Sequence, residues 1–480
     1  MKMKRVSVWV LFLAVLFLLP VECRAEETIA VPATDQFGLG GAVKGISNKP
    51  TTLDESLSPV GNNAITPAVA MDDRGNAIVA WSQYDGRFWR IFKSEYRDNV
   101  WHKPASITDF VSPDNGDATN PKVAMAENGD RIIVWEQSAK QSRYILMSEN
   151  RDGKWRQPAS TDEHISPGDS FSWEPDLAMD DLGNTVVVWN QEYLNGFHAV
   201  YKSEYRKGSW QHPASTKEAI SPAGDGDALR PQVAMNNRGE ALIAWTQDPV
   251  GVSRIYKSEY RHNTWTHPVD SNDCISPKTK QGGANTPVLA MDDNGRVVIA
   301  WQQSDGANAR IYLSEYRGNS WQHPKSLTDA VSPITVTNAQ INSIGMDNRG
   351  NTLLLWTSQQ MRNQALFVSA YRDGVWKHPG ENDFFIGSKS DYEFRIFGKV
   401  AMSASGKAVI VWQQMGDDSI SRVFMSEFDN GLWRLPGKKI SILDTPAING
   451  AIAASKNGNF VVVWQQRNGQ FDQIYKSEFR

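Results

Sequence analysis

One unit is repeated eight times along the chain, and residues 290–303, AMDDNGRVVIAWQQ, contain most of its pattern. The apolar run of each copy ends on a tryptophan. These tryptophans lie 52 to 56 residues apart: Trp81, Trp135, Trp189, Trp245, Trp301, Trp356, Trp412 and Trp464. A period of this length is typical of rings and arrays, in which one architecture uses the whole chain. The 480 residues therefore predict one repetitive domain rather than several ordinary ones.

Each unit is predicted to form four short β-strands, A to D. Strand A ends in an Asp/Asn-Gly turn, whose residues tolerate the positive φ of a tight hairpin. Strand B (VVIAW in residues 297–301) is apolar without alternation, as in strands buried on both faces. Strand C alternates (IYKSEYR in residues 255–261), and a second tight turn leads to strand D, which carries its own tryptophan. No helical periodicity is present.

Antiparallel four-stranded units of this kind are the blades of a β-propeller. The last unit lacks strand D, and residues 46–59 align without a gap on residues 100–113, with Ser47 in the place of Trp101. We therefore predict an all-β, eight-bladed propeller over residues 46–480, closed by residues 46–59 as the outer strand of the last blade. A seven-bladed ring with an extra terminal unit is the alternative.

The first residues have the features of an export signal. Lys2, Lys4 and Arg5 precede an apolar segment (6–19) that is short for a bilayer span, and Ala25 offers a cleavage site. We predict a signal peptide over residues 1–25 and a linker or loose arm over 26–45, with an uncleaved anchor as the alternative. No later segment is apolar enough for membrane insertion, so the predicted location is the periplasm, the exterior or the cell surface.

Charge and cysteine content exclude other classes. Signal removal takes four of 50 basic and one of 54 acidic residues, which leaves 46 against 53 and a net charge of about −7. Without any basic run, no nucleic-acid partner is expected. Cys274 would then be the one remaining cysteine, which rules out an internal disulfide.

The repeats, of the form A-x-D-x-x-G-N followed by V-x-W-x-Q, resemble those of secreted bacterial β-propeller proteins. They are loosely similar to the Asp-box repeats of sialidase-like propellers, although the Asp-box pattern S-x-D-x-G-x-T-W is absent. The resemblance covers residues 46–480 and implies the fold, whereas function has to be argued from a site.

Residues that recur in each blade are expected to build the scaffold. Ser258 has a counterpart in all eight units and Glu259 in all but one, where Ala370 stands. Four histidines share one slot of successive blades, too far apart to bind one zinc ion: His212, His267, His323 and His378. We therefore predict no catalytic centre and no cofactor in the repeats.

The B–C and D–A loops vary between blades and are predicted to emerge on one face, where a rigid scaffold would carry a binding site. After signal removal, Trp89 and Trp173 are the two tryptophans outside the repeat pattern. Aromatic rings beside polar groups suit a sugar or a peptide. The predicted binding residues are Trp89, Trp173, Tyr193, Phe197, Tyr392 and Arg395. The alternative is that these rings only stiffen the loops.

Several D–A loops are acidic. Calcium needs six to eight oxygen ligands, and the weak candidates to supply them are Asp114, Asp117, Asp225 and Asp227. Their spacing does not match an EF-hand loop, so plain solvated turns are the alternative.

The sequence as a whole predicts an extracytoplasmic, non-enzymatic recognition or scaffold protein with a glycan or protein partner. A subunit of a larger surface assembly fits equally. The alternative is a sialidase-like glycosidase, which needs an arginine cluster and a Tyr–Glu pair. The candidates for those roles are Arg87, Arg230, Arg362 and Arg395, with Glu192-Tyr193 and Tyr392-Glu393.

Overall fold

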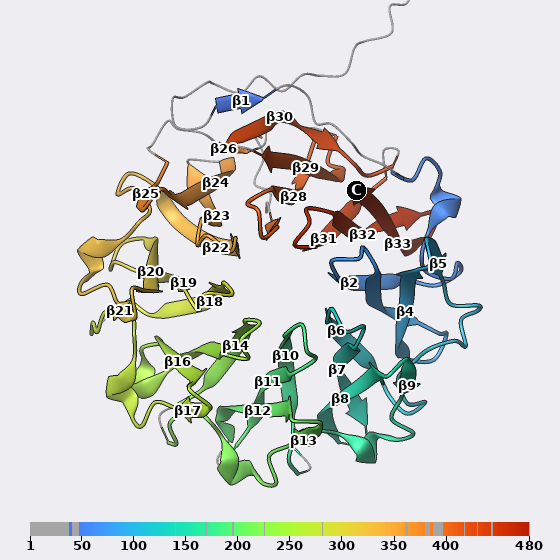
Figure 1. Cartoon of the computed structure of the whole chain (residues 1–480), viewed down its shortest axis with the longest axis horizontal. Helices are drawn as coiled ribbons and strands as arrows, with labels where there is room; N and C mark the ends of the chain where they lie inside the picture. The colour runs from blue at the N-terminus through green and yellow to red at the C-terminus, as the bar shows by residue number, and fades with distance from the viewer. Residues whose placement is uncertain are drawn as a thin grey trace, which may run out of the picture.

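The computed structural model describes residues 38–40, 48–139, 141–168, 170–193, 196–224, 226–280, 282–360, 363–379, 385–386, 397–416, 418–429, 431–442 and 445–479. In this part of the chain eight antiparallel sheets are arranged as a ring (Figure 1), so the predicted eight-bladed propeller is confirmed over its seven-bladed alternative. The predicted signal peptide lies outside the described residues and stays a prediction.

The first four blades each have four strands in sequence order, from the axis outwards. They are β2 (Ala64–Met71), β3 (Ala77–Tyr84), β4 (Trp89–Arg97) and β5 (Val100–His102); β6 (Ala118–Met125), β7 (Arg131–Ala139), β8 (Ser142–Arg151) and β9 (Lys154–Arg156); β10 (Ser172–Met179), β11 (Thr185–Glu192), β12 (His198–Arg206) and β13 (Ser209–Gln211); and β14 (Ala228–Met235), β15 (Ala241–Gln247), β16 (Arg254–Arg261) and β17 (Thr264–Thr266).

The later blades keep this order with additions at the outer edge. They are β18 (Ala284–Met291), β19 (Val297–Ser304), β20 (Ala309–Arg317) and β21 (Ser320–Gln322); β22 (Thr337–Met346), β23 (Thr352–Gln360), β24 (Asn363–Arg372) and β25 (Val375–Lys377), with β26 (Phe385–Ile386) paired to β24; β27 (Phe397–Met402), β28 (Ala408–Met415), β29 (Ser421–Asp429) and β30 (Leu432–Lys439); and β31 (Ala447–Ala454), β32 (Phe460–Asn468) and β33 (Phe471–Phe479). Within the arm predicted as loose, β1 (Gly38–Gly40) pairs in parallel with β30.

Short 3₁₀ helices lie in the connections: η1 (Leu53–Glu55), η2 (Thr161–Glu163), η4 (Thr216–Glu218), η5 (Pro249–Gly251), η6 (Ser271–Asp273) and η7 (Leu327–Asp329). No helix among the described residues is long and apolar enough to cross a membrane.

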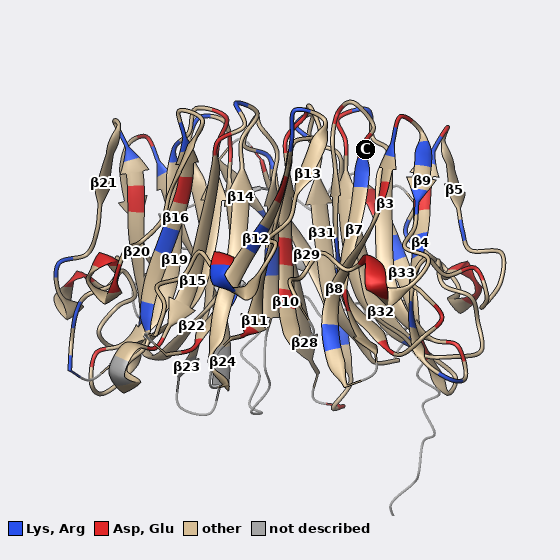
Figure 2. Ribbon diagram, turned by 90° about the horizontal axis from the view of Figure 1, so that it is seen from below, with Lys and Arg blue, Asp and Glu red and all other residues tan. Residues whose placement is uncertain are grey.

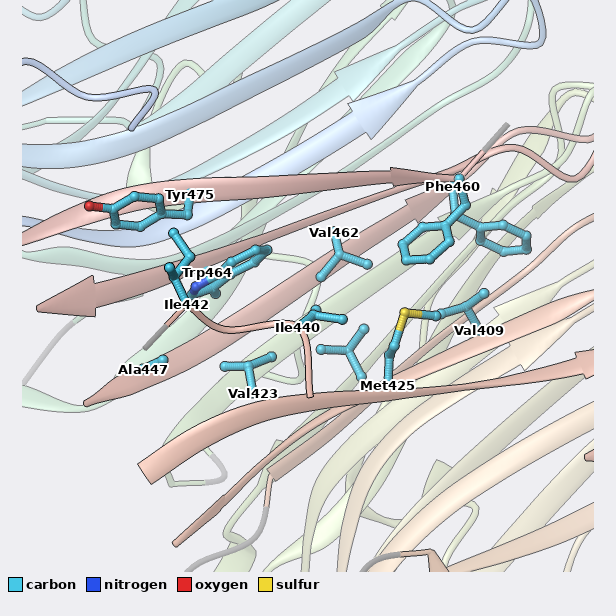
Figure 3. Packing of buried hydrophobic residues seen from close by; sticks show 12 residues of the cluster. Val409, Val423, Met425, Ile440, Ile442, Ala447, Phe460, Val462, Trp464 and Tyr475 are labelled. Carbon is cyan, nitrogen blue, oxygen red and sulfur yellow. The ribbon is translucent and has the colours of Figure 1, made fainter. Parts of the chain in front are cut away.

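The core lies between neighbouring blades. Residues 297–301 of β19, the second strand of their blade, are fully buried, as expected for a strand covered on both faces. Figure 3 shows the layer between the last two blades, where Val409 and Met425 of the seventh blade lie near Phe460, Val462 and Trp464 of the eighth. Because the same layer recurs around the ring, each blade is stabilised mainly by its two neighbours.

The two ends of the ring meet between the first and last blades, and β2 packs against β31 and β32. The amide of Leu57 donates to the carbonyl of Ile474 at 2.7 Å, just as Val111 donates to Ile91 at 2.8 Å inside the first blade. The segment before the first blade therefore packs on the last blade. The last sheet has three described strands, and residues 46–47 are not described, so the expected outer strand stays a prediction.

The two faces of the ring differ (Figure 2). Short A–B and C–D turns form one face, which we call the turn face, where Arg206 donates to the carbonyl of Gly239 in the next blade at 2.9 Å. The B–C and D–A loops form the opposite loop face, where Arg90 donates to the carbonyl of Pro113 at 3.0 Å. The predicted grouping of the variable loops on one face is thus observed.

Candidate functional site

The repeated Lys-Ser-Glu motif is used by the scaffold, as predicted. The Lys257 ammonium lies 4.6 Å from the ring of Trp321 in the next blade, and the indole Nε1 of Trp321 donates to the Glu259 carboxylate at 3.3 Å. Burial alone would raise the pKa of Glu259, but Lys257, Arg261 and the indole more than offset it and hold that pKa below its usual range. These groups join blades and are not free for chemistry.

The repeated histidines are also structural. His267 Nδ1 lies 2.9 Å from Ser258 Oγ, and the ring stacks on Trp265 at 5.6 Å between centroids. Burial lowers the pKa of His267 to about 4. A ring that is neutral and stacked in this way stabilises strand D.

An aromatic cluster occupies the loop face of the third blade. Phe171 and Trp173 are stacked at 5.6 Å with 14° between their planes, and His198 meets Trp173 edge-on at 5.0 Å. Arg143 of the second blade lies 5.9 Å from the Trp173 ring. Phe171 is 40% exposed and Trp173 is half-buried. We call Phe171, Trp173, His198 and Arg143 the aromatic cluster.

Polar contacts fix this cluster between blades. Arg143 pairs with the buried carboxylate of Glu136 at 3.1 Å. His198 Nδ1 lies 2.8 Å from Asp227 Oδ1 in the fourth blade, and the same oxygen accepts the His198 amide at 2.9 Å. The rings are therefore held by residues of three successive blades rather than by one mobile loop.

The other predicted binding residues are dispersed. Phe197 is 47% exposed and its carbonyl accepts from the amide of Tyr193, whose ring packs on the core between the second and third blades. Trp89 lies in the first blade, 5.8 Å from the ring of Tyr84. Tyr392 and Arg395 lie outside the described residues. The structure thus places Trp173, Tyr193 and Phe197 in the third blade and Trp89 two blades away.

A hollow of about 430 Å³ lies on the loop face of the first blade, lined by Asp85, Gly86, Arg87, Arg90, Ile107, Thr108, Phe110 and Asp114. Arg90 is buried and pairs with Asp85 at 2.6 Å and with Asp114. Burial of Asp85 would raise its pKa, but backbone amides and Arg90 hold the pKa below its usual range. Both carboxylates are therefore paired with the same guanidinium.

The acidic residues considered for calcium serve as ties between blades. Asp114 pairs with Arg90, and Asp117 Oδ1 accepts the amide of Trp89 at 2.9 Å. Asp227 Oδ1 accepts the amide of His198 in the same way, two blades further along the ring. Asp225 lies outside the described residues, and in the part of the chain that is described no group of three His, Cys, Asp or Glu side chains could hold a metal ion.

A feature that the sequence did not reveal surrounds the axis near the loop face. Seven innermost strands each carry one non-glycine residue with φ between 49° and 56°, at an irregularity in the strand: Thr66, Asn120, Glu174, Arg230, Thr286, Asn338 and Asn449. Such a backbone is costly for any residue other than glycine, asparagine or aspartate. The available signal was the proline that follows five of them, because proline inside a strand marks an edge or a bulge.

No family model matches the chain, and no curated protein matches it. Among solved structures, the chain is similar to an ulvan lyase of polysaccharide lyase family PL25 (TM-score 0.48, 11% identity, 80% of this chain and 96% of that one). It is also similar to an Aleuria aurantia lectin in complex with Fucα1-6GlcNAc (0.36, 14%, 63% and 94%) and to NanB sialidase from Streptococcus pneumoniae (0.38, 11%, 85% and 83%). At these values the similarity concerns the propeller fold alone.

Proposed function

We propose that the protein is an extracytoplasmic recognition protein that binds a glycan on its loop face, at the aromatic cluster. The observation that carries this proposal is the stacked and partly exposed pair Phe171–Trp173. Flat aromatic rings can stack on the apolar C–H faces of sugars, and such stacking has a defined geometry.

Polar groups beside the rings would fix the orientation of the sugar. Arg143 supplies guanidinium donors, and Glu174, exposed on β10, supplies a carboxylate. The bond between His198 Nδ1 and Asp227 leaves Nε2 as the second polar atom of that ring. A few convergent polar groups around an apolar surface are the usual composition of a ligand site.

Binding is favoured over glycoside hydrolysis because the two described arginines of the alternative, Arg87 and Arg230, lie apart. Arg87 lines the hollow of the first blade, whereas Arg230 donates to Thr286 beside the axis. Arg362 and Arg395 lie outside the described residues.

The test is a glycan array followed by calorimetric titration of the best hits with the mature protein and with Trp173→Ala. We expect Trp173→Ala to weaken binding by roughly two- to tenfold, from the ~0.5–1.5 kcal/mol of a stacked pair. Trp89→Ala is the matched control, because it removes a loop-face tryptophan from another blade. Absence of glycan hits, or equal losses in both variants, would refute the proposal.

Export is tested separately, by mass spectrometry of the protein recovered from outside the cytoplasm. We expect a mature chain that begins at Glu26. A full-length chain in the cytoplasm would contradict it.

A further inference from the structure

Three charged residues on innermost strands interact electrostatically with one another near the axis. Lys122 of β6 and Asp176 of β10 come from the second and third blades, and Lys399 of β27 comes from the seventh, on the opposite side of the ring (Figure 1). Lys122 Nζ lies 3.9 Å from Asp176 Oδ1, which is a loose ion pair. Asp176 Oδ2 accepts the amide of Val233 at 3.1 Å, so part of this carboxylate is already engaged.

Lys399 is the member of this group that has no ion-pair partner among the described residues. Within the described residues it makes no hydrogen bond and no ion pair, although it is exposed. The pKa of Lys399 is nevertheless lowered, first by desolvation and then by repulsion from Lys122, with Asp176 opposing. Exposure and a pKa lowered by desolvation are both expected of a side chain that reaches water along the axis and is otherwise surrounded by protein. Two ammonium groups thus share one carboxylate.

The axis is crossed by an ion pair at the turn face. Lys456 of the eighth blade pairs with Asp181 of the third and lies 3.6 Å from Asp73 of the first. The adjacent turns are linked to each other, since Asp73 N donates to Glu127 Oε1 at 2.7 Å and Asp181 N donates to Asn237 Oδ1 at 3.0 Å. Because this ion pair spans the axis at the turn face, an anion would reach Lys399 from the loop face.

We propose that Lys399 and Lys122 form an anion-binding site on the axis of the ring, which takes a small oxyanion from the loop face. The ligand chemistry is a carboxylate or phosphate group, carried by a uronic acid or present as free phosphate. The site stands on its own observations and does not depend on sugar binding at the aromatic cluster. An oxyanion would supply the second negative charge that the two lysines lack.

The test is calorimetric titration of the mature protein, at low ionic strength, with sodium phosphate, glucuronate and, as the neutral comparison, glucose. We expect saturable binding of at least one anion and none of glucose, with affinity falling as salt is added. Binding of phosphate only identifies free phosphate as the ligand, and binding of glucuronate only identifies a carboxylate. Failure of both anions to bind would overturn the proposal.

The variants are Lys399→Gln, Lys399→Arg and the control Lys325→Gln, which removes an exposed lysine from a D–A connection. We expect Lys399→Gln to weaken anion binding about tenfold or more, as for loss of a charged hydrogen bond. Lys399→Arg should retain binding, and Lys325→Gln should match wild type. Because Lys399 has no ion-pair partner among the described residues, Lys399→Gln should not lower the melting temperature. Unchanged anion affinity in a folded Lys399→Gln would refute the site.

Discussion

The backbone amide of Ile474 donates to Oγ of Ser58 at 3.0 Å, across 416 positions of the sequence. The same contact joins Ile91 to Ser112 at 3.2 Å inside the first blade. The hydroxyl of Tyr475 likewise donates to the carbonyl of Leu53 at 2.8 Å, as Tyr312 does to Leu327 in the fifth blade. The segment before the first blade therefore belongs to the packing of the last blade.

Leu57→Ala should destabilise the whole ring. Leu57 is 1% exposed and packs in the core between the first and last blades. Its truncation is expected to lower the free energy of unfolding by about 2–5 kcal/mol. Urea denaturation measures this loss of stability. The control is Val60→Ala, because Val60 lies in the same segment but is 70% exposed. Equal effects would show that this segment does not close the ring.

Glu259→Ala should cost more stability than Glu315→Ala, although both residues occupy the same position in adjacent blades. Glu259 accepts the indole of Trp321 at 3.3 Å and pairs with Lys257 at 2.7 Å. Glu315 pairs with Arg317, but Leu313 replaces the lysine, and Nε1 of Trp376 in the following blade has no partner in the described structure. We expect a difference of about 1–2 kcal/mol in the free energy of unfolding. Similar losses would mean that the indole contact does not stabilise the blades.

The scaffold could be predicted because its determinants are local. The Asp/Asn-Gly turns, the apolar B strands and the period of the tryptophans each depend on residues close in sequence. The structural role of Ser258 and Glu259 followed from their repetition. These local features were sufficient to predict the eight blades and their order.

The candidate site could be predicted only in part, because it depends on contacts between repeats. Trp173 was identifiable as a tryptophan outside the repeat pattern. Its contact with Arg143 could not be predicted, because it depends on how the second and third blades pack against each other. Asp117 looked available for a cation, yet its oxygen binds the backbone of the preceding blade. The positive φ of Glu174 arises from a strand irregularity, and the only local signal of that irregularity is the proline that follows.

Acid should destabilise the protein through its buried histidines. Burial lowers the pKa of His378 to about 4, and that of His267 to about 4 with Lys202 adding to the effect and Glu204 opposing it. The unfolded chain, with histidines near 6.5, therefore takes up protons first as the pH falls. The neutral histidines contribute their full share of the free energy of unfolding above pH ~6.5. That share is lost as the pH falls towards ~4, by at most about 1.4 kcal/mol per pH unit for each histidine.

The measurement is urea denaturation at pH 7 and pH 5, for wild type and for the double variant His267→Gln/His378→Gln. We expect the wild type to lose more stability over this interval than the double variant. An identical pH dependence in the two proteins would show that other groups dominate acid unfolding.

Thr286→Gly should leave stability unchanged or raise it by up to about 1 kcal/mol. Thr286 has φ of 56°, which costs a β-branched residue roughly 1–2 kcal/mol, whereas glycine adopts it freely and loses about 0.5–1 kcal/mol in chain entropy. Its Oγ1 also accepts from Arg230 at 3.0 Å, so the strained backbone holds polar side chains beside the axis. Thr352→Gly is the control, because Thr352 is fully buried in the ordinary strand β23 and its replacement should destabilise by more than about 1 kcal/mol. If urea denaturation gave equal losses for the two variants, the strand irregularity would not be strained, and its recurrence around the axis would need another cause.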